Sequence, residues 1–206
     1  MNITAKELLE KHRKSSDFSR YDGRILALRN QGVTVDHIEA GVGDTVRVLE
    51  NGGKSFVIYG EPQAGKTETM IALTCKLLDM GYRTIFIVMN DNTELETQNF
   101  DRFHAAVELK PTPLRDWEVI DLDLKQIKQD RPRIIFCRKN SKNLEKLIDA
   151  CRFMTKRVLI DDEADYASPN SKINKSEVTE INKKIGQLSQ IEKDGIYIEG
   201  LNEMLV

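Results

Sequence analysis

The sequence predicts an α/β fold in which a parallel sheet is covered by helices on both faces. Apolar runs of strand length alternate along the chain with amphipathic segments of helical period. Continuously apolar runs are typical of parallel strands, because both faces of a parallel sheet are buried. The first run leads into a glycine-containing loop, GEPQAGKT, and a helical segment follows that loop. In such folds, ligands bind at the carboxyl ends of the strands.

Residues 1–52 are expected to form a small helical extension. A capping-box pattern over residues 4–7 opens a peripheral helix, and a polar stretch follows it. Apolar residues between positions 34 and 49 recur at helical spacing, and Asn51-Gly52-Gly53 ends that helix just before the first strand. Residues 53–206 are then expected to form the main domain.

Strands and helices are expected to alternate through this main domain. Each strand segment is rich in apolar residues and bounded by polar, glycine or proline residues. Strands are expected over 56–59, 84–89, 117–122, 133–137, 157–160 and 195–198. Helices are expected from 68 to a stop at Gly81, over 92–107 before the Pro111 and Pro113 break, over 141–155 and over 177–188.

Composition excludes several classes of protein. The net charge of −2 gives no global attraction to nucleic acid, so any such binding needs a local basic patch. No apolar run approaches the roughly 20 residues of a membrane helix. The N-terminus lacks the apolar core of a signal peptide. We therefore expect a cytoplasmic protein without a membrane partner, whose cysteines are buried free thiols: Cys75, Cys137 and Cys151.

The glycine-containing loop has the GxxxxGK[ST] spacing of a phosphate-binding loop, between a strand and a helix as that motif requires. Glycines let phosphate oxygens approach backbone N–H groups, and the helix N-terminus favours the anion. Lys66 is expected to reach the outer phosphates of ATP and Thr67 to hold Mg²⁺. The alternative is an ordinary glycine turn with an exposed lysine. The predicted cofactor-binding residues are Gly60, Glu61, Pro62, Gln63, Ala64, Gly65, Lys66 and Thr67.

A cluster of acids follows the strand expected at 157–160. An ATPase needs such carboxylates opposite its phosphate loop. Asp162 is the candidate for holding the Mg²⁺ hydration shell, and Glu163 for orienting the attacking water. A register shift of one residue would instead make Asp161 the metal residue. Acids after a strand also commonly act as helix caps, which is the structural alternative.

These residues carry a family resemblance. GEPQAGKT and the Asp-Glu-Ala-Asp sequence at 162–165 resemble the first motif and the DEAD signature of superfamily-two helicases. The sequence looks closer still to helicase-like ATPases encoded beside bacterial restriction and defence nucleases. That likeness rests also on MNDNTELETQNFDRF, IIFCRKNSKNLEKL and IDDEADYASPNSKINKSEVTEIN, within residues 56–198. It implies the first RecA-like domain of a motor directed at nucleic acid, DNA in particular.

By the same resemblance, four residues are candidates for weak contact with a nucleic-acid backbone: Asn90, Gln98, Arg102 and Lys139. Gln98 and Arg102 could equally lie on an exposed helix face. Lys139 and Asn140 could contact a strand of nucleic acid or cap the helix expected at 141.

The sequence also departs from the family pattern. Glu199-Gly200-Leu201-Asn202 stands where these families have a Thr-Ala-Thr-Pro motif. The resemblance then implies a domain incomplete at its C-terminus, whose arginine finger comes from a second RecA-like domain or a partner subunit. Arg138 is the one internal arginine expected at the correct edge of the sheet, since Arg131 and Arg133 begin a strand.

Three functions remain open at this point. The first is an ATP-hydrolysing domain of a nucleic-acid motor. The second is a kinase, which is disfavoured because a water-activating Glu163 has no use when the acceptor is a hydroxyl. The third is a switch or interaction module that binds nucleotide without turnover, which the missing C-terminal motif favours. Lys66 is expected to be exposed in the empty loop and to make no core contact, so Lys66→Ala should abolish nucleotide binding with little loss of fold.

Overall fold

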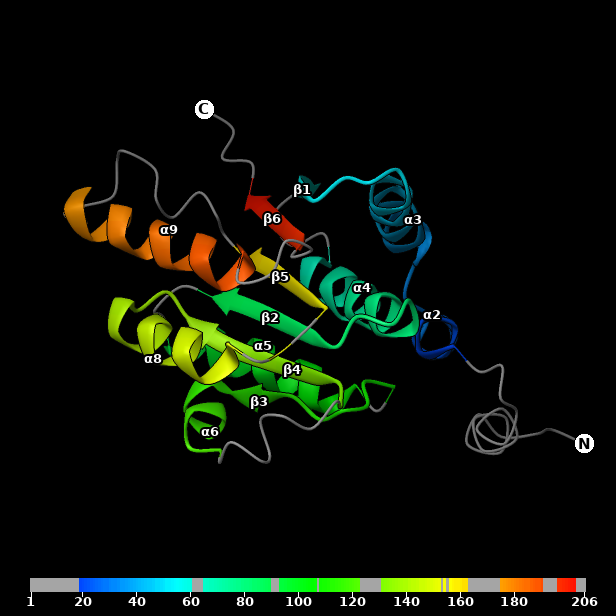
Figure 1. Cartoon of the computed structure of the whole chain (residues 1–206). Coiled ribbons are helices and arrows are strands. Elements are labelled where there is room, and N and C mark those ends of the chain that lie inside the picture. The colour runs from blue at the N-terminus through cyan, green and yellow to red at the C-terminus, as the bar shows by residue number, and fades with distance from the viewer. Residues whose placement is uncertain are drawn as a thin grey trace, which may run out of the picture.

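The described part of the chain contains six strands that form one sheet, in which every pairing is parallel. A computed structural model describes residues 19–60, 65–89, 93–106, 108–122, 131–152, 154, 156–162, 175–190 and 196–202. The strand order is β1-β6-β5-β2-β4-β3. The prediction of an α/β fold with a parallel sheet is therefore confirmed (Figure 1).

The elements alternate along most of the chain as the sequence predicts. The strands are β1 (Ser55–Gly60), β2 (Thr84–Met89), β3 (Leu114–Arg115), β4 (Arg133–Arg138), β5 (Arg157–Asp162) and β6 (Ile196–Asn202). The helices are α2 (Arg20–Asn30), α3 (Asp36–Glu50), α4 (Lys66–Asp79), α5 (Thr93–Ala105), α6 (Asp116–Ile120), α8 (Ser141–Cys151) and α9 (Lys175–Gln190).

Helices cover both faces of the sheet, and a separate apolar cluster lies under each layer. One cluster joins α2, α3, α4 and α5 to alternate residues of β2, β4 and β5. The other joins α6, α8 and α9 to the intervening residues of the same strands. The chain moves outward from β1 to β3 along the first face and returns to β6 along the second. This arrangement follows from the right-handed crossover that parallel strands require.

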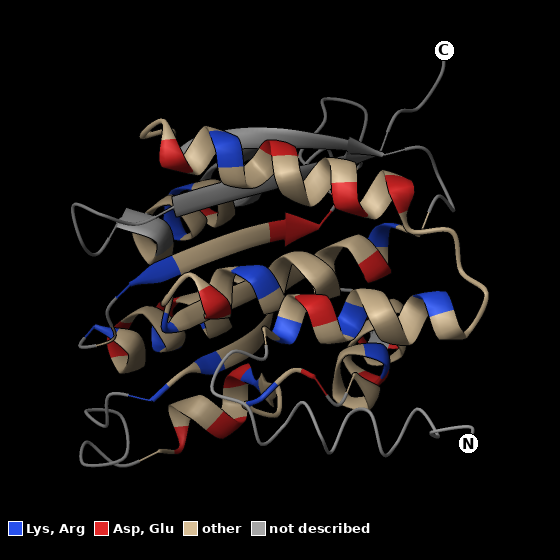
Figure 2. Cartoon of the chain, turned by 90° about the vertical axis from the view of Figure 1, so that its right-hand side faces the viewer, with Lys and Arg blue, Asp and Glu red and all other residues tan. Residues whose placement is uncertain are grey.

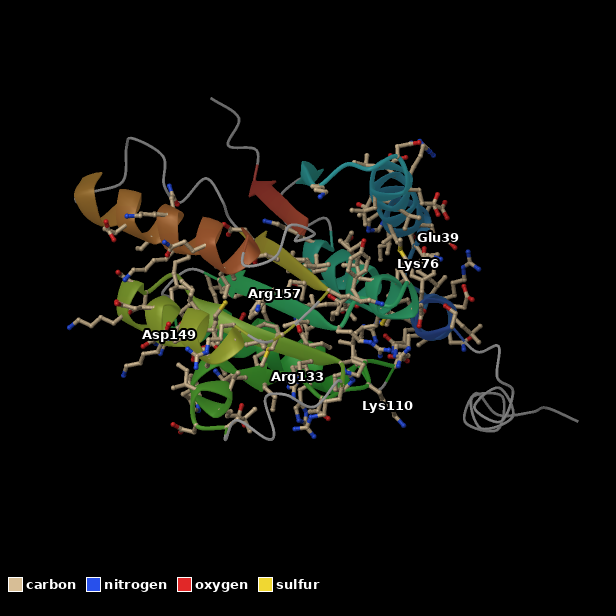
Figure 3. The ribbon with its side chains drawn as sticks, in the orientation of Figure 1. Glu39, Lys76, Lys110, Arg133, Asp149 and Arg157 are labelled. Carbon is tan, nitrogen blue, oxygen red and sulfur yellow. The ribbon has the colours of Figure 1, made fainter. Side chains whose placement is uncertain are left out.

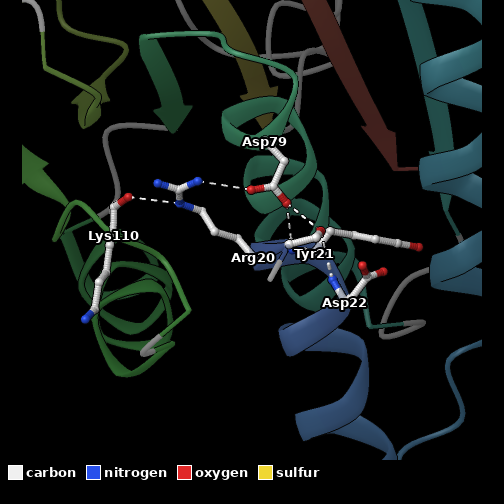
Figure 4. Close-up of polar contacts among 6 residues, drawn as sticks. Arg20, Tyr21, Asp22, Asp79 and Lys110 are labelled. Atoms are coloured by element: carbon white, nitrogen blue, oxygen red, sulfur yellow. Dashed lines mark hydrogen bonds and ion pairs between the residues drawn. The ribbon is translucent and has the colours of Figure 1, made fainter. Parts of the chain in front are cut away.

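The N-terminal helices are built onto the same core as the sheet. Ile25 and Leu28 of α2 are buried in the first apolar cluster. Polar contacts fix the start of α2 against the end of α4, where Asp79 accepts from the Arg20 guanidinium at 3.0 Å and from the Tyr21 backbone N–H at 3.0 Å (Figure 4). Arg20 Nε also donates to the Lys110 carbonyl at 3.2 Å. Helix α2 therefore bridges the far end of α4 and the segment after α5.

Two sequence predictions of local structure are wrong. Most of the strand predicted over 117–122 lies in helix α6 (Asp116–Ile120) instead, where the Glu118 carboxylate accepts from the backbone N–H of Arg115 at 2.7 Å and so caps the first turn. The helix predicted over 141–155 ends at Cys151 instead. The buried Arg157 side chain points back at this turn and donates to the carbonyls of Met154 and Cys151, which terminates the helix (Figure 3).

The three cysteines are free and buried, as predicted. Burial raises the pKa of the Cys151 thiol to about 12 and raises the pKa of the Cys75 and Cys137 thiols as well. These thiols are therefore held in their unreactive protonated form. None of the helices in the described ranges is long and apolar enough to cross a membrane. The helix predicted from residue 4 lies outside the described residues.

Candidate functional site

The residues of the predicted site gather at the carboxyl edge of the sheet. Strand β1 ends at Gly60 and β5 ends at Asp162, and β6 lies between them in register with both. Gly65 then adopts φ +77 and leads directly into α4. That backbone conformation favours glycine, because it places the Cβ of other residues too close to the next carbonyl. The N-terminus of α4 therefore begins beside the end of β5.

Lys66 and Asp162 form an ion pair at this edge. Lys66 Nζ lies 2.7 Å from Asp162 Oδ1, and the two side chains are 21% and 11% exposed. The expectation that Lys66 is exposed is therefore wrong, because its side chain is partly buried and its ammonium is held by Asp162 at the end of β5. The contact joins residues from the two separately predicted halves of the site.

Asp161 points to the other face and pairs with Lys139. Its carboxylate lies 2.7 Å from Lys139 Nζ, and both side chains are at most 6% exposed. The alternation of side chains along β5 explains the division, since consecutive residues of a strand face opposite ways. Figure 2 shows this strand with a basic start, at Arg157, and an acidic end. Asp162, and not Asp161, thus faces Lys66.

Lys139 is buried in that pair, at the carboxyl end of β4. A polynucleotide would reach its ammonium only by breaking the contact with Asp161. The neighbouring Asn140 caps α8, because its side chain accepts from the backbone N–H groups of Lys142 and Asn143 at 3.1 and 3.3 Å. The capping interpretation is therefore confirmed for Asn140, while Lys139 serves the packing of the sheet edge.

The hydroxyl of Thr67 is contacted by two residues of α5. Thr67 Oγ1 donates to Asn99 Oδ1 at 2.9 Å and accepts from Arg102 Nη1 at 3.4 Å. Helix α5 is oriented by Phe103, whose ring packs edge-on against Phe136 of β4 at 5.0 Å. Asn99 and Arg102 lie three positions apart on the same side of the helix, so both reach the start of α4. Sequence reasoning missed Asn99 entirely.

The remaining arginines named from the sequence lie away from this point. Arg138 stacks over the ring of Trp117 at 5.9 Å, on the side of β3 and α6. Arg133 is buried at the opposite edge of the sheet, where β4 begins, as expected (Figure 3). Gln98 is exposed on α5. Three groups of predicted residues lie outside the described residues: Glu61 to Ala64, Asn90 and Glu163.

The donor set suits Mg²⁺ chemistry. The Thr67 hydroxyl and the Asp162 carboxylate supply oxygens, which are the ligands that Mg²⁺ prefers, and Mg²⁺ keeps several waters beyond one or two protein ligands. No cluster of three or more His, Cys, Asp or Glu side chains suited to a metal occurs in the described ranges. A site of this kind would therefore need phosphate oxygens to complete it.

Replacing Gly65 with alanine is expected to destabilise the protein by about 1–3 kcal/mol, because its φ is strained for any side chain. The new Cβ would also lie 3.2 Å from His37 Nε2 of α3. Urea denaturation measures the loss. Gly43→Ala is the matched control, because Gly43 lies in helix α3 with open space around it and should gain about 0.5–1 kcal/mol. Equal stability of Gly65→Ala and the wild type would contradict the strain.

Comparison with protein-family models gives no match, and no curated protein matches the sequence.

Proposed function

We propose that this chain is an ATP-binding, ATPase-type domain with a RecA-like phosphate loop, from a helicase-like motor directed at DNA. The observation that supports the proposal most is the 2.7 Å contact between Lys66 and Asp162. The contact brings a phosphate-loop lysine and a strand-end aspartate together at one point, where Mg²⁺ and phosphate could lie between them. An ordinary glycine turn with an exposed lysine would not need that pairing.

The proposal gives each residue a chemical role. Backbone N–H groups of the loop between Gly60 and Thr67, except at Pro62, which has none, would bind the phosphates, aided by the N-terminus of α4. Lys66 would leave Asp162 for the outer phosphates, Thr67 would hold Mg²⁺, and Asp162 would hold the hydration shell of the metal. The metal neutralises charge on the phosphates when it is bound. Glu163 orients the water that attacks the terminal phosphate.

The proposal extends to two partners. Nucleic acid would bind weakly through its backbone, as the net charge of −2 implies. A second RecA-like domain or a partner subunit would supply an arginine finger, which is worth about 10³–10⁵ in rate where it has been measured. The runner-up is a nucleotide-dependent switch without turnover, and a kinase ranks third.

Glu163→Gln is expected to leave the affinity for ATP within about twofold of wild type and to lower hydrolysis by about 10²–10⁴, because the amide is isosteric but cannot act as a base. Calorimetry measures the affinity, and release of labelled phosphate measures the rate. Unchanged hydrolysis would remove Glu163 from the mechanism. Wild type that binds ATP without measurable turnover would favour the switch.

The kinase alternative has its own control. Small hydroxyl compounds are incubated with labelled ATP and the wild-type chain, and products are separated by chromatography. We expect labelled inorganic phosphate and no phosphorylated acceptor. If a hydroxyl compound were phosphorylated faster than labelled inorganic phosphate is released, kinase activity would become the preferred function.

A further inference from the structure

The guanidinium of Arg102 differs from most other arginines on this side of the sheet. Carboxylates pair with Arg20, Arg24, Arg29, Arg47 and Arg115. Within the ranges that the structure describes, Arg102 has no carboxylate at ion-pair distance, and its polar contact is the hydroxyl of Thr67. Arg102 is thus a cation without a neighbouring carboxylate in these ranges, and it lies next to a predicted phosphate site. An anionic ligand at that site could pair with it.

The hydrogen bonds of Thr67 show how this cation relates to the site. A hydroxyl has one proton to donate and two lone pairs to accept with. The proton is given to Asn99 at 2.9 Å, which turns the lone pairs away from Asn99. One lone pair accepts from Arg102 at 3.4 Å, which is long for a hydrogen bond. Arg102 therefore makes a weak hydrogen bond to the same Thr67 oxygen that would bind Mg²⁺.

We propose that Arg102 is a phosphate-contacting residue of the ATP site and that Asn99 positions the Thr67 hydroxyl for the metal. This inference rests on the proposed function. A guanidinium and a divalent cation on one hydroxyl repel each other, unless an anion lies between them. Phosphate oxygens provide that anion, so Arg102 moves from Thr67 to the terminal phosphate when Mg²⁺-ATP is present.

The proposal replaces the earlier candidate roles of two arginines. Arg102 was expected to touch nucleic acid, whereas its one polar partner among the described residues is Thr67 of the glycine loop. Arg138 was the one internal arginine expected at the correct edge of the sheet, and its guanidinium lies over Trp117. Arg102 therefore supplies positive charge from within the chain.

The test compares nucleotides that differ by one phosphate. Arg102→Gln keeps the helix propensity of the residue but shortens the side chain and removes its charge. We expect calorimetry with Mg²⁺ to show about tenfold weaker binding of a non-hydrolysable ATP analogue, as for loss of one hydrogen bond to a charged group. Binding of ADP should change less than about twofold, because the terminal phosphate is missing. Arg47→Gln, an exposed arginine on α3, is the matched control and should change neither affinity.

Asn99 is tested through its dependence on metal. Asn99→Ala should weaken binding of the ATP analogue in Mg²⁺ by about fivefold, while in EDTA the variant and the wild type should bind alike. A loss of equal size with and without metal would show that Asn99 only supports the fold, and would overturn its positioning role.

The outcomes separate this inference from the proposed function. If Lys66→Ala loses the nucleotide and Arg102→Gln does not, the proposed function stands and the role of Arg102 fails. Equal losses for ATP analogue and ADP would also overturn the contact with the terminal phosphate. Binding of a fluorescent single-stranded oligonucleotide at low salt is measured in parallel. A loss there, with nucleotide affinity unchanged, would assign Arg102 to nucleic acid. If wild type binds no nucleotide, both proposals fall.

Discussion

Lys66→Ala is expected to lower the affinity for Mg²⁺-ATP by about 100-fold or more, as measured by calorimetry. The ammonium would make charge-assisted hydrogen bonds to two phosphates, each worth about 1.5–3 kcal/mol, and its loss leaves the phosphates with less positive charge. The fold is also affected, because Asp162 then keeps a largely buried carboxylate without the partner that lies 2.7 Å away. We expect the free energy of unfolding to fall by about 1–3 kcal/mol.

The double variant Lys66→Ala with Asp162→Asn separates these two effects. In the double variant the carboxylate of Asp162 is replaced by a neutral amide, so no unpaired charge is left at this position. Stability should therefore return to within about 1 kcal/mol of wild type. Nucleotide affinity should stay low, since both predicted ligands of the site are altered. Wild-type affinity in Lys66→Ala would refute the phosphate loop, and unchanged stability would show that the pair with Asp162 contributes nothing.

Lys139→Ala is expected to cost about 3–5 kcal/mol of unfolding free energy, the range for breaking a buried ion pair from one side. Both side chains of the Lys139–Asp161 pair are at most 6% exposed, so water does not replace the lost ammonium. Such a loss is a large share of the roughly 5–15 kcal/mol that stabilises a domain. Urea denaturation at constant pH measures it.

A matched double variant shows how much of that cost comes from the orphaned charge. Lys139→Met with Asp161→Leu replaces the pair by apolar side chains of similar volume, a change that is often near neutral. We expect most of the lost stability to return. If the double variant were as unstable as Lys139→Ala, the attraction between the two charges would itself stabilise this edge of the sheet. The instability of Lys139→Ala would then not come from the unpaired carboxylate of Asp161.

The sequence predicts most strands because they are buried on both faces. The continuous apolar run at β2, for example, has the bounds that were expected, 84–89. The segment at 117–122 mixes apolar residues with two acids, and it is helical as far as Ile120. The cap made by Glu118 depends on a backbone geometry that composition does not reveal. Burial is thus easier to predict than the capping of a short helix.

Some residues of the candidate site could be predicted from the sequence. The spacing of the glycine loop predicted Lys66 and Thr67, and the acids after the strand predicted Asp162, with Asp161 as the alternative. Which face α4 covers depends on the handedness of the crossover and on strand order, so the pairing of Lys66 with Asp162 needed the structure. Asn99 carries no spacing signal, because its position depends on how Phe103 seats α5.

The division of two adjacent acids between opposite faces limits how β5 can vary. Substitutions at Val158, Leu159 or Ile160 change packing but preserve which carboxylate meets which ammonium. Deleting one residue from the middle of the strand would instead turn both acids to the opposite face. Asp161 would then point toward the side of Lys66, and Asp162 toward the side of Lys139. The length of this strand is therefore under a stricter constraint than its composition. Across natural variants, insertions and deletions would accumulate outside residues 157–162, even where the side chains within them drift.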